Sequence, residues 1–452
     1  MSISKLKFSR NLSSSAFSRY FSFSALYVAQ GIPEGMTYFA IPAWMAANGK
    51  TPMEIASFLA VVGIPWSFKI LIAPLMDRFT LVSMGRKRPW IIIGQLGLIL
   101  SFLCIGLIPD PLNNAVGLMA AGFFISFFGA FQDVATDGMA VDVIPIKEQA
   151  RANGLMWGTK IAGISLSLVI GTALINTLGF SLAISCLAIA VALIMLVPLF
   201  IRERPGEKFM PWSKKGQASE TAKKTQLQTW KQIFKSLYRV VKLRSSLIFI
   251  LAMFINGLML GLIDTLMPIF SVQELGWTNS YFSNVFSIAT ISSGILGMLL
   301  GGYLVDHFGK MKMMTIYLVL ISALIVLFAF LTGLWSIQVV MYGFIFIYYT
   351  LSTFLTIAVF ASGMHLCWKT VAATQFTLFM AVSNMGRASG SAMLGVLKTH
   401  FNWDIVFLIT ALSPFLMLII IRFIHFKRHR AKVNNFDIPD KGFAVASIVR
   451  DL

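Results

Sequence analysis

The chain has 452 residues, of which 57% are hydrophobic and only 12% are charged, and its formal net charge at pH 7 is +19. Soluble domains carry about 25% charged residues, so this composition excludes an ordinary soluble protein and predicts a protein with many membrane spans. Three cysteines and five histidines are scattered without metal-site or redox spacing. We therefore expect no metal and no cofactor.

Twelve stretches are long and apolar enough to cross a bilayer, which takes about 20 residues of helix. They are 20–46, 54–76, 90–108, 115–141, 152–177, 180–201, 246–270, 281–304, 313–332, 335–361, 371–397 and 402–425. Ahead of the second stretch, Thr51-Pro52-Met53-Glu54 resembles a capping box with proline at the first helical position.

A polar segment with twelve Lys or Arg residues separates the first six stretches from the last six. We therefore predict an all-α membrane protein with 12 transmembrane helices in two parallel-repeat six-helix halves. The predicted parts are a first half at 1–201, a basic linker at 202–245, a second half at 246–426 and a tail at 427–452.

The basic residues predict the orientation. Of the 37 Lys and Arg residues, 32 fall in the two termini and in alternate loops, and only Lys50 and Lys398 fall in the other loops. Because basic loops stay in the cytoplasm, we expect both termini to be cytoplasmic. The positive charge then reflects topology and contact with anionic lipid, and no nucleic acid is expected as a partner.

The two halves repeat each other in sequence. Three residues of the first stretch recur 226 positions later in the seventh: Gly31, Gly35 and Pro42 correspond to Gly257, Gly261 and Pro268. Repeated halves around a site at the middle of the membrane are typical of transporters that work by alternating access.

A loop pattern also recurs, and it indicates a gate. Gly302-Tyr-Leu-Val-Asp306-His-Phe-Gly309-Lys310 follows the eighth stretch, and a longer version around Asp77 follows the second. A carboxylate next to a basic cluster can hold neighbouring helices in one state and release them in another, although these basic residues could simply anchor the loops. The gating candidates are Asp77, Arg78, Arg86, Arg88, Asp142, Arg151, Asp306 and Lys310.

Carboxylates inside the apolar stretches of the first half are candidates for proton coupling, because charges at this depth are costly and usually face a polar interior. At 1.5 Å per residue of helix, Asp137 lies at a depth similar to that of Lys69 and Lys160. We therefore expect charge pairing in the first half, either as a static network or as part of transport. The proton-coupling candidates are Glu34, Asp133 and Asp137.

In the second half, Asp264 and Arg387 lie at matching depth, so we expect them to contact each other or to bind solute. The run of small residues around Arg387 would let helices approach closely. Hydroxyl groups in the tenth stretch could bind solute or serve packing. The solute-binding candidates are Lys69, Gln132, Lys160, Asp264, Tyr342, Tyr349 and Arg387.

Four segments together resemble one branch of the major facilitator superfamily, which holds AmpG-type muropeptide permeases, acetyl-CoA transporters and siderophore permeases. The segments are QGIPEG, PWSFKILIAPLMDR with GRKRPW, QDVATDGMAVDVIP, and ATQFTLFMAVSNMGR. Lys69 with Asp77, Gln132 with Asp133 and Asp137, and Arg387 match the branch's patterns. Asp137-Gly138-Met139 departs from the muropeptide permeases and is closer to the siderophore and acetyl-CoA members.

This resemblance implies a proton-coupled secondary transporter of the bacterial inner membrane that imports a muropeptide-type or siderophore-type solute and works as a monomer. Its partners would be the bilayer, the small polar solute and protons. The alternatives are a transporter of an acyl-CoA-like anion, and a receptor or assembly factor that keeps the fold without transport. A membrane enzyme would need a nucleophile and base, and His365 and Cys367 form the only close His/Cys pair.

Overall fold

Helices form almost all of the chain that the computed structural model describes, namely residues 10–436 without 80, 214–215, 218–229 and 369–370. The helices of the first half are α1 (Ala16–Gly35), α2 (Ile41–Ala47), α3 (Pro52–Ser67), α4 (Lys69–Arg78), α5 (Arg88–Gly106), α6 (Ala115–Val143), α7 (Ile146–Leu178) and α8 (Phe180–Phe200). Those that follow are α10 (Trp230–Val241), α11 (Arg244–Ile269), α12 (Asn279–Leu296), α13 (Gly302–Phe308), α14 (Lys310–Phe330), α15 (Gln338–Leu366), α16 (Ala372–His400), α17 (Trp403–Ile421) and α18 (Phe426–Asn434).

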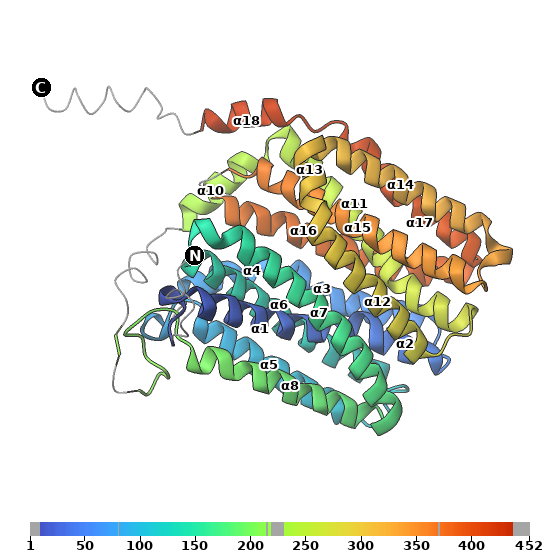
Figure 1. Cartoon of the computed structure of the whole chain (residues 1–452), viewed down its shortest axis with the longest axis horizontal. Helices are drawn as coiled ribbons and strands as arrows, with labels where there is room; N and C mark the ends of the chain where they lie inside the picture. The colour runs from blue at the N-terminus through green and yellow to red at the C-terminus, as the bar shows by residue number, and fades with distance from the viewer. Residues whose placement is uncertain (1–9, 80, 214–215, 218–229, 369–370, 437–452) are drawn as a thin grey trace, which may run out of the picture.

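Figure 1 shows the helices from α1 to α8 lying together on one side of the bundle and those from α10 to α18 on the other. Two junctions join the sides, because α3 packs against α16 and α7 packs against α12. The α7–α12 junction is polar: Thr172 shares a 2.8 Å hydrogen bond with Ser283, and Asn176 donates to the side chain of Asn279 at 3.0 Å. At the α3–α16 junction, Gly63 faces Ala388 so closely that a β-carbon would collide.

Each of the twelve predicted stretches corresponds to helix, and ten helices of the described chain are long and apolar enough to cross a membrane. The predicted capping box is confirmed, since Thr51 and Glu54 cap each other's backbone at the start of α3. The second stretch is not continuous as predicted. It breaks at Phe68 between α3 and α4, three residues after Pro65.

One end of the bundle carries the start of α1, the loop at 81–87, the segment at 202–209 and the start of α11, and we call it the basic end. Backbone hydrogen bonds tie its parts together, because Leu12 donates to the carbonyl of Arg202 at 2.9 Å and Lys208 donates to Ser83 at 2.8 Å. At the other end, Gln273 donates to the carbonyl of Lys50 at 2.7 Å. The two sides of the bundle are therefore bridged at the end opposite the basic one.

Candidate solute and proton site

Close packing of α1 on α7 positions the first charged pair. A β-carbon at Gly31 would collide with the carbonyl of Lys160, and one at Gly163 would collide with the backbone of α1. Glycine thus lets the two backbones approach, as small residues do in membrane helices. Across this crossing, the ammonium of Lys160 lies 2.8 Å from the carboxylate of Glu34, and both side chains are largely buried.

The second half repeats this arrangement between α11 and α16. A β-carbon at Gly261 would collide with the carbonyl of Arg387, which lies 227 positions after Lys160. The predicted contact is confirmed: Nη2 and Nε of Arg387 approach Oδ2 of Asp264 at 2.6 and 2.9 Å. The guanidinium also lies 3.9 Å from the ring centre of Tyr38, which belongs to the first half.

A third pair lies at the break between α3 and α4. Lys69, the first residue of α4, pairs with Asp133 of α6, and both are more than nine-tenths buried. The ring of Trp66 lies 5.0 Å from the ammonium of Lys69 and 5.5 Å from that of Lys160. Its carbonyl accepts a 3.2 Å hydrogen bond from Asn384 of α16. Trp66 therefore joins two cations of the first half to a helix of the second.

Asp137 differs from the other carboxylates at this level. Its Oδ1 accepts a 2.5 Å hydrogen bond from the hydroxyl of Tyr27, which is buried in α1. Asp137 itself is exposed, and it forms no ion pair with any residue that the structure describes. Because it points at a buried group of α1 and shares a helix face with Asp133, the carboxylate faces the neighbouring helix α1.

Among the described residues, one of the four carboxylates has no ion-pair partner. Lys69, Lys160 and Arg387 each pair with another acid, and Asp137 remains. Lone charges at membrane depth are costly, and a proton on the remaining carboxylate removes that cost. Of the three proton-coupling candidates, Asp137 is thus the one that pairs with no described cation.

Three other solute-binding candidates lie in different surroundings. Gln132 is fully buried, and its amide donates to the carbonyl of Leu26 at 3.1 Å. Tyr342 lies near the start of α15, where its hydroxyl pairs with that of Tyr281, so the structure does not bring it to the charged pairs. Tyr349 packs against the ring of Phe286, with ring centres 4.8 Å apart, and its buried hydroxyl has no hydrogen-bond partner among the described residues.

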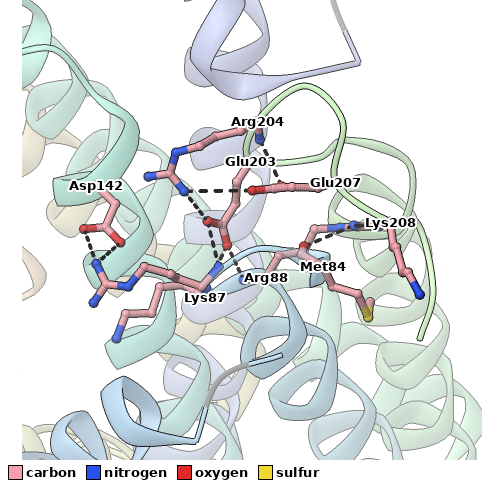
Figure 2. Close-up of polar contacts among 9 residues, drawn as sticks. Met84, Lys87, Arg88, Asp142, Glu203, Arg204, Glu207 and Lys208 are labelled. Atoms are coloured by element: carbon pink, nitrogen blue, oxygen red, sulfur yellow. Dashed lines mark hydrogen bonds and ion pairs between the residues drawn. The ribbon is translucent and has the colours of Figure 1, made fainter. Parts of the chain in front are cut away.

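The loop at 81–87 forms a network with the end of α6 and with the segment after α8 (Figure 2). Asp142, a gating candidate, lies beside the loop's basic residues, with Nη1 of Arg86 at 2.9 Å from its carboxylate. The fully buried carboxylate of Glu203 accepts hydrogen bonds from the backbone amides of Arg86, Lys87 and Arg88 at 3.0, 2.7 and 2.7 Å. One charged side chain thus satisfies three backbone amides, as buried polar groups require.

Arg88 and Glu207 complete this network. The guanidinium of Arg88 donates to the carbonyls of Pro198, Leu199 and Lys208 at 2.5 to 2.8 Å. Burial and the nearby charge of Glu203 raise the pKa of the Glu207 carboxyl to about 7, although the backbone amide of Arg204 donates to it.

Four gating candidates, Asp77, Arg78, Arg151 and Asp306, have side chains outside the described part of the structure. The remaining one, Lys310, begins α14 at the recurring loop of the second half.

Sequence reasoning missed several residues of the site. Tyr27 and Tyr38 lie seven positions before and four after Glu34, so helical spacing could have placed all three on one face of the first stretch. Trp66 precedes Lys69 by three positions, so helical spacing could likewise have placed these two on one face. Glu203 carried none, because its partners are more than 110 residues away in the chain.

A sequence profile described as the Major Facilitator Superfamily matches residues 23–391. The chain belongs to this superfamily. The anhydromuropeptide permease of Escherichia coli K12 is 23% identical over 406 residues, which cover 87% of this chain and 77% of the permease. A transporter named AmpG 3 from Rickettsia prowazekii is 22% identical over 436 residues, covering 90% of this chain and 97% of that protein.

Solved structures agree on the fold. The nucleoside transporter NupG superposes with a TM-score of 0.68 at 14% identity, covering 90% of this chain and 98% of NupG, and a mutant of it gives 0.70. At this identity the likeness shows the fold alone. The superfamily and the named relatives identify the chain as a multi-pass membrane transporter rather than an enzyme, and they confirm the resemblance drawn from the sequence.

Proposed function

We propose that this transporter imports a muropeptide-type solute across the bacterial inner membrane by proton-coupled alternating access. The observation that carries the proton coupling is the excess carboxylate: Asp137 has no cationic partner among the described residues, whereas Asp133, Glu34 and Asp264 each have one. The name of one relative, the anhydromuropeptide permease, supports the solute class. The absence of a P-loop motif from the sequence fits drive by a gradient.

The three paired cations suit a solute that carries carboxylates. Lys69 and Lys160 lie beside the ring of Trp66, and Arg387 lies over Tyr38. A solute carboxylate can replace the protein carboxylate at such a cation, and Arg in particular matches the planar geometry of a carboxylate. The neighbouring aromatic rings offer apolar faces to sugar rings. We therefore assign solute binding to these three cations.

The proposed topology has twelve spans, with the basic end and both termini in the cytoplasm. The excess of basic residues at that end supports this orientation. The bridge from Gln273 to Lys50 then lies on the outer side, which fits a state closed toward the outside. The halves at 1–201 and 246–426 would move against each other as units in a monomer, with the network around Arg86 and Asp142 as part of the gate.

The test is uptake of radiolabelled anhydromuropeptide by the purified full-length chain in liposomes with an imposed proton gradient. We expect at least about tenfold accumulation, abolished by a protonophore. Asp137→Asn should lose accumulation but keep solute exchange across the membrane, because exchange needs no net proton movement. Asp110→Asn, at an exposed carboxylate in a loop, is the matched control and should behave like the unchanged protein.

Two outcomes would overturn the proposal. Accumulation that survives the protonophore, or that Asp137→Asn leaves intact, would remove the proton from the mechanism. Absence of both accumulation and exchange in the unchanged protein, with the fold intact, would favour the receptor alternative or another solute. Transport of an acyl-CoA by the same liposomes would identify that compound class as the other solute.

A further inference from the structure

A pocket of about 320 Å³ opens at the basic end of the second half, away from the charged pairs. It is lined by Gly309, Lys310, Met311, Lys312, His365 and Phe426. Its walls therefore come from the loop before α14, the end of α15 and the start of α18. Apart from Lys310, which is a gating candidate, its residues have no role in the proposed transport cycle.

The repeat within the chain shows what the equivalent place in the first half holds. Gly85 and Gly309 stand at the same position of the recurring loop pattern, and both have positive φ, 109° and 90°. At Gly85 the space beside the α-carbon is filled by the carboxylate of Glu203. At Gly309 the same space is open, with no described heavy atom within 4 Å of an added β-carbon.

The backbone amides that follow each glycine also differ in whether a side chain accepts their hydrogen bonds. In the first half, Glu203 accepts from the amides of Arg86, Lys87 and Arg88 at the start of α5. In the second half, α14 begins directly at Lys310, and no side chain of its N-cap residue bonds its first amides. The start of a long helix attracts an anion through such amides and the helix dipole. In the first half, the protein itself supplies that anion.

Lys310 and Lys312 line the pocket, and Arg430 lies next to His365 of its lining. Lys310, Lys312 and Arg430 form no ion pair with any described residue; Lys312 lies over the ring of Phe308, and Arg430 lies 3.4 Å from Nε2 of His365. His365 in turn stacks on Phe426, with ring centres 5.1 Å apart. The pocket thus combines helix amides, open volume and positive charge that no described acid balances.

We propose that this pocket binds a phosphate group, which occupies the position that Glu203 fills in the first half. Three or more donors around one anion suit the several acceptor oxygens of phosphate, which Lys and Arg side chains and helix amides recognise together. The phosphate belongs either to the headgroup of an anionic lipid or to a soluble phosphate compound. Both present the same chemistry to the pocket.

The test compares the purified full-length protein with Lys310→Gln/Arg430→Gln and with Arg428→Gln, which removes an exposed charge from α18 outside the pocket lining. One arm measures thermal unfolding in detergent as inorganic phosphate replaces chloride at constant ionic strength. The other arm measures it in nanodiscs of phosphatidylcholine with and without about 30% phosphatidylglycerol. We expect one ligand to raise the melting temperature saturably, with the apparent Kd rising at least about tenfold in the double variant and unchanged in Arg428→Gln.

Protection by inorganic phosphate assigns a soluble ligand, and protection only by phosphatidylglycerol assigns a lipid headgroup. Equal responses of the double variant and Arg428→Gln to both probes, or no response of the unchanged protein to either, would overturn the proposal. If the double variant does not fold, Met311→Glu replaces it. This variant places a carboxylate in the pocket as Glu203 does in the first half, and it should abolish the response to the ligand.

Discussion

In the first half, Lys160 pairs with Glu34 across a glycine crossing of two helices, and in the second half Arg387 pairs with Asp264 across the equivalent crossing. The halves differ in what surrounds this repeated pair. The first half adds further acids at the same level, whereas the second half has Asp264 as its one paired acid among the described residues there.

The same difference holds at the basic end. The first half closes its loop with its own carboxylate, Glu203, while the second half leaves the equivalent place at Gly309 open and basic. The repeated loop thus has different surroundings in the two halves. In the first half the protein's own carboxylate satisfies the loop amides, and in the second half we propose that a phosphate takes that place.

The largest expected effect is on the isolated pair of the second half. Arg387→Ala leaves Asp264, which is 6% exposed, buried without a cation. Breaking a buried pair by removing one partner destabilises a protein by about 3–5 kcal/mol. We expect the lowest melting temperature of the single variants here, together with loss of uptake. Asp264→Ala/Arg387→Ala should recover part of the stability, and a double variant no more stable than Arg387→Ala would contradict an isolated pair.

The next effect concerns the closed loop of the first half. Glu203→Gln removes one of the two oxygens that accept the amides of residues 86–88 and introduces an amide donor beside them. Buried donors left without acceptors cost about 1–3 kcal/mol, so we expect a loss of about 2–3 kcal/mol in the free energy of unfolding. Hydrogen exchange at residues 86–88 should become faster. Glu274→Gln, at an exposed site near the opposite end, is the control and should change neither quantity.

Glu207 makes the first half's loop network sensitive to pH. An unfolded glutamate titrates near 4.5, whereas in the folded protein the pKa of Glu207 is about 7 because of burial and the charge of Glu203. Between these values the folded state binds more protons, so this contribution to stability is complete below the lower pKa and falls as pH rises through the upper one. We expect about 2 kcal/mol to be lost between about pH 5 and pH 8. Glu207→Gln should flatten the melting temperature over this range, and an unchanged pH slope would contradict the assignment.

Much of this arrangement follows from local sequence. The helical stretches and the capping box at Thr51 and Glu54 were predictable because their signals act over one or two helical turns. Asp264 and Arg387 are 123 positions apart, and their matching depth in the membrane predicted the contact. Depth alone left the partners of Lys69 and Lys160 open. Several acids lie at similar levels, and helix rotation, which the bilayer does not fix, decides which of them meet.

Longer-range features could not be predicted. Glu203 lies in a segment that reads as a polar linker, and its role depends on a loop more than 110 positions earlier in the chain. The break at Phe68 lies on the C-terminal side of Pro65, whereas proline disturbs the helical turn before it, so Pro65 in the sequence does not predict this break. The open pocket beside Gly309 becomes visible only when the two loops are compared in space.

The smallest expected effect tests the contrast between the halves. Asp133→Asn removes the partner of Lys69, yet Asp137 lies four positions along the same helix face and within reach of the charge of Lys69. The lysine can therefore pair again, so we expect a stability loss of about 1 kcal/mol, the scale of one hydrogen bond. The new pair would engage the acid that we assign to the proton, so uptake driven by a proton gradient should fall much more than stability does. A loss of stability as large as that of Arg387→Ala would show that the first half has no spare acid, and the contrast between the halves would then be wrong.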